Sequence, residues 1–493
     1  MRVKAGGRNL KQGETGQLQT GWRWETLVLL LILVGTVLLR FPDLDRTSLW
    51  YDEAVSWDQS KGTFTELLTA VAADNYPPLH NIVLWLSMPA LGDSETALRL
   101  PSALLGLVAV LLMYPLASMM AGRSAGLAAA ALLAVSPFHI WYSTEARMYA
   151  LLAATGLAFL LATLKLLQRA SGRWQVALAV SGTLFLYSHI YAVLGFAAVG
   201  LVCGFFALVD IFRNKSVSGS NAFKACLAMA VSALLFLPWL LILASRVRSV
   251  AEEGFWIAYP DAAFLKGMIF SISGSLFLFW LLLALALVGL LQVLIQPSRH
   301  GPTPFSSRGL LVCIAYALGP PLLAYFYSVL VQPILFDRYL IAAWPGLLLL
   351  AAIAAQRLLP QIAPLALVAT ALLLSLPELK FTLQTKIRPE WRLIAEDYQS
   401  QRGPDDRLVL YKGFAAPALS YYLRTPEAFA TVEKSDDLKT LDRKDKWLLI
   451  VHSNDAETTS VLKAFNAEES AVASQRFGWG ASGLRLIKPR SAD

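Results

Sequence analysis

Long apolar runs constrain the fold of this chain more than any other feature of its sequence. They recur from residue 26 to residue 379 and reach eighteen residues or more. A helix needs roughly 20 residues to cross the hydrocarbon core of a bilayer. Backbone groups in lipid must form hydrogen bonds within their own segment, and these runs lack the alternation of barrel strands. With 56% hydrophobic and only 15% charged residues, the sequence predicts a membrane protein built from helices.

The apolar runs predict an all-α polytopic membrane protein with about eleven transmembrane helices. Residues 42–97 are too polar to span, apart from the short run Ile82–Leu91, which predicts a helix lying in the membrane interface. The run 264–295 is long enough to include a re-entrant or tilted piece. The expected spans are 24–41, 98–119, 124–141, 149–168, 174–191, 193–212, 224–244, 264–295, 309–331, 338–356 and 361–379.

The charges in the loops predict the orientation of the chain. Basic residues gather in the N-terminal tail, residues 1–23, and in alternate loops, whereas acidic residues dominate 42–97. The positive-inside rule therefore predicts a cytoplasmic tail and an extracytoplasmic first loop in the inner (plasma) membrane. Eleven spans would place the C-terminus outside as well. Because the net charge of +8 resides in these loops and in a mixed-charge tail, it does not indicate nucleic-acid binding.

The composition changes from Lys380, where acidic and basic residues become frequent and nearly balanced. We therefore predict a transmembrane domain over 24–379 and a small soluble α/β domain over 380–493 on the extracytoplasmic face. Within this second domain the patterns predict strands at Asp406–Tyr411 and Trp447–Val451 and helices at Pro417–Leu423 and Thr458–Phe465.

Two adjacent carboxylates follow the first span. Asp52 and Glu53 are flanked by Trp50 and Tyr51, an aromatic setting that a solvated helix end does not need. A carboxylate at the membrane surface can act as a general base toward a hydroxyl group, or bind a divalent cation such as Mg²⁺ or Mn²⁺. The alternative is that both acids simply face water.

A histidine follows a rigid turn later in the same loop. His80 comes after Tyr76 and two prolines, at the start of the expected interfacial helix. A histidine there can donate a hydrogen bond to a phosphate or take part in proton transfer. The alternative is a turn that serves only to begin the helix.

Charged residues recur at two further positions that the same topology places outside. Glu145, Arg147 and Tyr149 lie between the third and fourth spans, and Arg338 lies between the ninth and tenth. Charges so close to an apolar boundary are costly and usually functional, and the planar guanidinium of arginine suits a phosphate. The alternatives are a structural ion pair or an arginine that anchors the chain at the interface.

Together these stretches predict an enzyme whose donor is a lipid-linked phosphate. The carboxylates would abstract a proton, the arginines would hold an anion, and aromatic side chains would lie at the lipid boundary. Tyr51, Tyr76 and Tyr149 are expected in the substrate pocket.

The order of the motifs resembles the polyprenyl-phosphate-sugar-dependent glycosyltransferases of the GT-C fold. That group includes the protein O-mannosyltransferases and the bacterial aminoarabinose lipid A transferases. The resemblance covers residues 24–379 and is most specific over 48–150. It rests on Trp50–Glu53, Tyr76–His80, Arg99–Ser102, Ser136–Leu151, Phe336–Leu340 and Trp344–Gly346.

The resemblance implies an inverting transfer of a sugar from a polyprenyl-phosphate donor to a lipid, glycan or protein acceptor. Asp52 would be the base, with Glu53 and Glu145 ordering the site. Arg147 and Arg338 would hold the leaving phosphate, and His80 is a further candidate for that role. The resemblance fixes neither sugar, acceptor nor metal.

Two other functions stay open from the sequence. One is a transporter or flippase for lipid-linked or charged solutes, although the spans carry almost no charge at mid-depth. The other is a non-catalytic assembly protein that binds a partner through its C-terminal domain.

Overall fold

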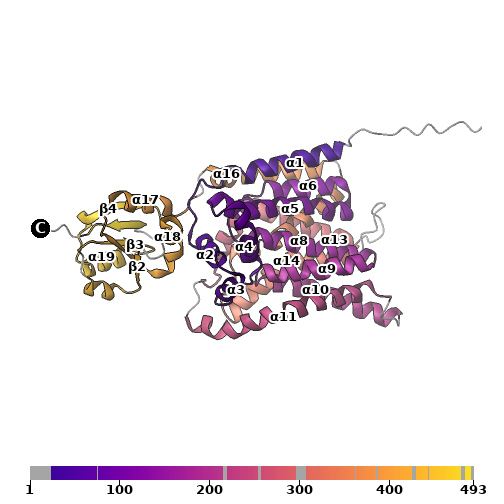
Figure 1. Ribbon diagram of the computed structural model, residues 1–493. Helices are drawn as coiled ribbons and strands as arrows, with labels where there is room; N and C mark the ends of the chain where they lie inside the picture. Colours follow the sequence, from indigo (N-terminus) through magenta and orange to yellow (C-terminus); the bar gives the residue numbers. More distant parts are fainter. Residues whose placement is uncertain are drawn as a thin grey trace, which may run out of the picture.

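A bundle of long helices forms most of the molecule, and a small domain with a β-sheet lies beyond one end of it (Figure 1). The predicted tail, residues 1–23, lies outside the described residues. The computed structural model describes residues 24–74, 76–214, 219–253, 257–295, 307–360, 362–384, 387–424, 429–441, 444–478 and 483–489.

Every predicted span contains a helix. Among the described residues, six single helices are long and apolar enough to cross a membrane, or up to eight spans if two bent pairs are included. The chain is therefore a multi-pass membrane protein, whereas the count of eleven spans stays a prediction. The bundle helices are α1 (Trp24–Arg40), α5 (Glu95–Ala121), α6 (Arg123–Ala134), α7 (Pro137–Ser143), α8 (Tyr149–Gln168), α9 (Gly172–Ser188), α10 (Ala192–Asn214), α11 (Asn221–Glu253), α12 (Ala262–Ser273), α13 (Leu276–Ile295), α14 (Ser307–Leu330), α15 (Ala343–Leu358) and α16 (Ala363–Gln384).

Both bent pairs have a local cause. The chain turns by 63° between α6 and α7, where Pro137 begins the second helix and the Ser136 side chain accepts a hydrogen bond from the backbone of His139. It turns by 81° between α12 and α13, where Gly274 has a φ of 72° that suits glycine. The bend within 264–295 agrees with the piece expected there.

Three short helices of the first loop lie at the end of the bundle next to the sheet (Figure 1): α2 (Tyr51–Ser60), α3 (Phe64–Ala72) and α4 (Leu79–Leu91). Helix α4 contains the expected interfacial run. It ends at Gly92, whose φ is 79°, and Ser94 then caps α5 by accepting a hydrogen bond from the backbone of Ala97. These breaks keep the loop at one end of the bundle.

A five-stranded sheet organises the small domain. Its order is β2-β1-β3-β5-β4; β2, β1 and β3 are parallel, and β5 and β4 are antiparallel to their neighbours. Helices α17 and α18 pack on one face and α19 on the other. The elements are α17 (Trp391–Gln401), β1 (Arg407–Tyr411), α18 (Ala416–Leu423), β2 (Phe429–Val432), β3 (Lys446–Ile450), α19 (Asp455–Ala464), β4 (Val472–Arg476) and β5 (Leu484–Ile487).

The sheet domain is fastened to the first loop through α18. The Tyr422 hydroxyl accepts a hydrogen bond from the Leu49 backbone at 2.7 Å, and the Tyr421 hydroxyl donates one to the Asp93 carbonyl at 2.7 Å. The guanidinium of Arg424 lies 2.6 Å from the Asp93 carboxylate. These contacts hold the domain against Leu49, which precedes Asp52, and against Asp93, which precedes α5.

Candidate active site

The two adjacent carboxylates lie in the first turn of α2. Trp50 is extended, with φ −89° and ψ 174°, and helix begins at Tyr51. The partial positive charge of a helix N-terminus favours acids at this position. Successive helical residues point in different directions, so Asp52 and Glu53 have different partners.

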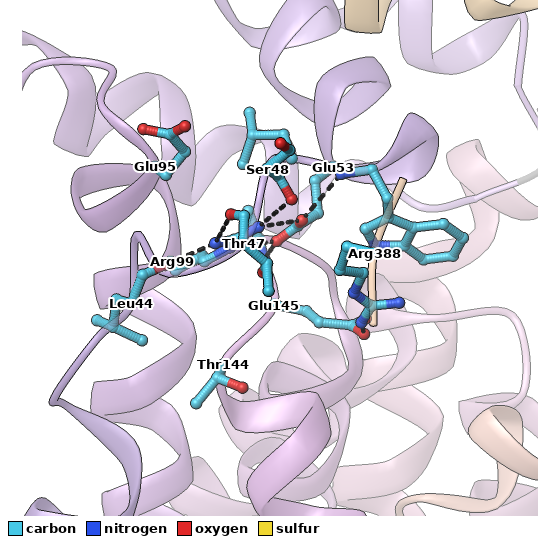
Figure 2. Close-up of polar contacts among 12 residues, drawn as sticks. Leu44, Thr47, Ser48, Glu53, Glu95, Arg99, Thr144, Glu145 and Arg388 are labelled. Carbon is cyan, nitrogen blue, oxygen red and sulfur yellow. Dashed lines mark hydrogen bonds and ion pairs between the residues drawn. The ribbon is translucent and has the colours of Figure 1, made fainter. Parts of the chain in front are cut away.

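Glu53 is fully buried against Arg99 of α5 (Figure 2). Arg99 Nε and Nη2 donate to its two carboxylate oxygens at 2.7 and 2.6 Å. Burial alone raises the pKa of Glu53, but the charge and hydrogen bonds of Arg99 outweigh burial and hold that pKa below its usual range. Arg99 also donates to the carbonyls of Leu44, Thr47 and Ser48. The geometry therefore favours a positioning role for Glu53, consistent with the ordering role that the resemblance implied.

Asp52 faces Arg338. Asp52 Oδ2 lies 3.4 Å from Arg338 Nη1, and both side chains keep some exposure, 18% and 14%. Arg338 lies in a short 3₁₀ helix, η1 (Asp337–Leu340), and its guanidinium lies over the rings of Trp50 and Tyr149. The structure thus brings together the predicted base and a predicted phosphate ligand from opposite ends of the bundle sequence.

Arg147 contacts α2 from the other side. Its Nη1 donates to the Asp52 carbonyl at 3.0 Å and to Ser56 Oγ at 2.9 Å, and its guanidinium lies over the ring of Tyr76. The Tyr76 hydroxyl lies 3.3 Å from the Tyr339 hydroxyl, next to Arg338. Arg147 therefore supports the helix that carries Asp52, and its role as a phosphate ligand stays a prediction.

Arg388, a residue that the sequence analysis did not single out, forms an ion pair with Glu145 (Figure 2). It lies beyond α16 and is sandwiched between the rings of Trp50 and Trp141, at 4.9 and 4.7 Å from their centroids. Its side chain is only 4% exposed, and within the described part of the chain its Nε has no hydrogen-bond partner. Only a weak sequence signal indicated a site role of Arg388, because it is a single arginine before Pro389 and lies after the last expected span.

A cavity of about 500 Å³ lies beside these groups. Arg338, Arg388, Glu145 and Glu378 supply charge to its lining, and Trp50 supplies aromatic surface. The apolar part of its lining comes mainly from α7 and α16. The volume falls within the usual range of small-molecule sites, about 300–1,000 Å³.

The remaining predicted site residues surround this centre. His80 is buried on the first turn of α4; burial, and then the charge of Arg147, lower its pKa to about 3, so the ring is neutral at pH 7. Tyr149 is buried beside Arg338, and Tyr51 packs edge-on against Phe414 of the sheet domain. The phosphate-binding role of His80 and the pocket roles of the tyrosines stay predictions.

The two adjacent carboxylates have separate partners. Asp52 faces Arg338, whereas both oxygens of Glu53 accept from Arg99. Across the described residues, no group of three or more His, Cys, Asp and Glu side chains is arranged to hold a metal ion. A bound Mg²⁺ or Mn²⁺ stays a prediction, and we derive no step through a metal.

Residues 75–242 match the family model of dolichyl-phosphate-mannose-protein mannosyltransferases. The structure is also similar to that of ArnT from Cupriavidus metallidurans in the apo state, with 14% sequence identity and a TM-score of 0.63. For ArnT bound to undecaprenyl phosphate, the identity is 15% and the TM-score is 0.62. Each match covers 94% of this chain and 97% of ArnT. It is similar to the archaeal oligosaccharyltransferase AglB from Archaeoglobus fulgidus, in complex with an inhibitory peptide and a dolichol-phosphate (12%, TM-score 0.54), covering 87% of this chain and 69% of AglB. No curated protein matches the chain by sequence.

At these identities the structural likeness shows the fold, and the family match adds a sequence signature over the stretch that contains His80, Glu145 and Arg147. The fold and the signature agree with the order of motifs in the sequence. Together they confirm the predicted resemblance to the glycosyltransferases of the GT-C fold.

Proposed function

We propose that this protein transfers a sugar from a polyprenyl-phosphate donor to a hydroxyl group of a lipid, glycan or protein acceptor, with inversion at the anomeric carbon. The acceptor oxygen attacks the anomeric carbon as its proton passes to a base. The bond between that carbon and the phosphate oxygen breaks, and the electron pair leaves with the lipid phosphate. The protein must therefore supply a base on one side of the sugar and positive charge on the other.

Asp52 is the base in this proposal. Its carboxylate is partly exposed, whereas Glu53 is enclosed by Arg99, so Asp52 is the one of the two adjacent carboxylates that is placed to meet an incoming hydroxyl group. Arg147 and Glu53 fix the first turn of α2 from two sides, which holds the carboxylate in position. General base catalysis of this kind contributes roughly 10²–10⁴ to a rate.

Arg338 and Arg388 hold the leaving phosphate. Both line the same cavity, and their guanidinium groups rest on aromatic faces rather than in open water. A low-dielectric setting strengthens charge-assisted hydrogen bonds to a phosphate as negative charge develops on it. The apolar surface of α7 and α16 would accept the first part of the lipid chain.

The 3.4 Å contact between Asp52 Oδ2 and Arg338 Nη1 carries this proposal. It joins a candidate base to a cavity that is lined by Arg338 and by a second arginine, Arg388. We place this end of the bundle on the extracytoplasmic side of the inner membrane. The acid-rich first loop supports that orientation through the positive-inside rule. No observation favours the transporter alternative, since the buried ion pairs of the site gather at one end of the bundle rather than at mid-depth.

The proposal is tested with the full-length protein in lipid nanodiscs. A panel of undecaprenyl-phosphate sugars is supplied with a membrane extract as the acceptor source, and release of undecaprenyl phosphate is measured. We expect release from at least one donor and a fall of roughly 10²–10⁴ in Asp52→Asn. Asp43→Asn, which changes an acid of the same loop in a turn before α2, is the matched control. Absence of release from every donor, or equal release by Asp52→Asn, would refute the proposal.

A further inference from the structure

The sheet domain has a topological switch point between β1 and β3. Strands β1 and β3 are adjacent and parallel, and the helices that follow them, α18 and α19, pack on opposite faces of the sheet. The loops after β1 and β3 therefore diverge at the carboxyl ends of the strands. In open α/β sheets, the crevice between such loops is where ligands bind.

Two residues in this crevice have an unusual backbone conformation. Lys412, directly after β1, has a φ of 74°, and His452, just after β3, has a φ of 49°. Residues other than glycine rarely adopt such angles, and those that do cluster at functional sites. Lys412 Nζ holds the loops together by donating to the His452 carbonyl at 2.8 Å and to Glu457 at 3.0 Å.

The crevice faces the cavity of the transmembrane domain. His452 lines the same cavity as Arg338 and Arg388, although it comes from the other domain. The Phe414 ring packs edge-on against both His452 and Tyr51, at centroid distances of 5.8 and 5.3 Å. The edge of the sheet is thus seated next to the residue that precedes Asp52.

The lining of the cavity combines apolar, cationic and other polar side chains. Pro137, Phe138 and Phe381 are apolar and the two arginines are cationic. The other polar groups are Tyr142, Glu145, Ser271, Glu378, Thr382 and His452. A polyprenyl chain fits the apolar side chains and its phosphate fits the arginines. The sugar is attached directly to that phosphate, and it is too polar for the apolar part of the lining. We therefore expect it to lie against the polar part of the lining. The sheet domain contributes His452 to that part, and its imidazole can both donate and accept hydrogen bonds.

We propose that the crevice formed by Phe414 and His452 is the sugar subsite of the donor cavity, and that His452 recognises a hydroxyl group of the donor sugar. This inference rests on the proposed function. It makes the sheet domain a source of sugar specificity, whereas the helical domain binds the lipid phosphate that all such donors share.

The test compares donors with and without the sugar, so it needs no acceptor. Dissociation constants are measured for undecaprenyl phosphate and for its mannosyl, glucosyl, aminoarabinosyl and arabinofuranosyl forms, with the full-length protein in nanodiscs. The sugar increment is the ratio of the constant for bare undecaprenyl phosphate to that for the tightest sugar-bearing form. His452→Asn is the informative variant, because asparagine tolerates a positive φ. Asp445→Asn, at a φ of 57° before β3 and at the opposite edge of the sheet, is the matched control.

We expect His452→Asn to lower the sugar increment by about 3- to 10-fold, the effect of one neutral hydrogen bond. Binding of bare undecaprenyl phosphate should stay within twofold, and Asp445→Asn should change neither quantity. An unchanged increment in His452→Asn, an equal loss for bare undecaprenyl phosphate, or a wild-type increment of one for every sugar would overturn the sugar subsite. Failure of the proposed function has a different signature, since the wild-type protein would then not bind undecaprenyl phosphate at all.

Discussion

Replacing Arg99 by methionine should destabilise the protein strongly, although Arg99 touches no substrate in our proposal. The substitution keeps much of the length of the side chain but leaves the Glu53 carboxylate buried without its counter-charge. Breaking a buried pair in this way typically costs about 3–5 kcal/mol. Arg99 also donates to three carbonyls between Leu44 and Ser48, so the segment that leads into α2 loses its anchor.

A double-mutant cycle separates the pair from its surroundings. Arg99→Met, Glu53→Gln and the double variant are compared with the wild type in detergent, and the free energy of unfolding is measured. Glu53→Gln removes the stranded charge, so the double variant should be more stable than the sum of the single losses predicts. We expect a coupling of about 2 kcal/mol or more, near the upper part of the range for contacting residues.

Activity provides the second measurement on these variants. Loosening the first turn of α2 displaces Asp52, so release of undecaprenyl phosphate should fall in Arg99→Met even at temperatures where the protein stays folded. A loss of stability below about 1 kcal/mol in Arg99→Met, or strictly additive losses in the double variant, would refute the reasoning that Glu53 depends on Arg99.

We expect four further outcomes, three from contacts of the site and one from the charges of the loops. Arg99 lowers the pKa of Glu53 in the folded state, so the ionised Glu53 should stabilise the protein fully above about pH 4.3, the usual pKa of glutamate, and this stabilisation should be lost as the pH falls below that value. Below about pH 4.3 the free energy of unfolding should therefore depend less on pH in Glu53→Gln than in the wild type. Arg388→Ala should weaken binding of undecaprenyl phosphate about tenfold or more, and Arg388→Lys should restore only part of it, as isothermal titration would show. Arg147→Ala should lower turnover more than donor affinity, seen as a fall in kcat with a nearly constant donor KM. A reporter fused after Asp493 should be extracytoplasmic and one within 213–222 cytoplasmic; a cytoplasmic C-terminus would contradict the proposed orientation.

The local elements of the fold could be predicted from the sequence because each has a local cause. Hydropathy marked the helices of the bundle. The local causes of their ends are glycine, serine and proline: α4 ends at Gly92, Ser94 caps α5, and Ser136 and Pro137 begin α7 at its bend from α6. The number of membrane spans depends on tilt and neighbours as well as on apolar length, so helices of 16 or 17 residues such as α15 and α1 leave it open.

The site could be predicted only in part, because its pairing is set by tertiary contacts. Asp52 and Arg338 were found from their residue types and their common side of the membrane, and the structure places them together. The same reasoning predicted a phosphate ligand in Arg147, and it could not show that this guanidinium also donates to the backbone of α2. Arg388 was missed because its partner Glu145 and its two tryptophans lie far away along the chain.

The contact between the two domains explains how one cavity can bind the lipid phosphate and also recognise the sugar, as we propose. The arginines are fixed by the helical domain. His452 reaches the cavity from the sheet domain, which Tyr421, Tyr422 and Arg424 help to fasten to the first loop. The bond from the Leu49 backbone to Tyr422 is made only three residues before Asp52. The proposed base and the proposed sugar subsite therefore share one support. A rigid support of this kind keeps the anomeric carbon within reach of the base, and small misplacements there would cost much of the rate.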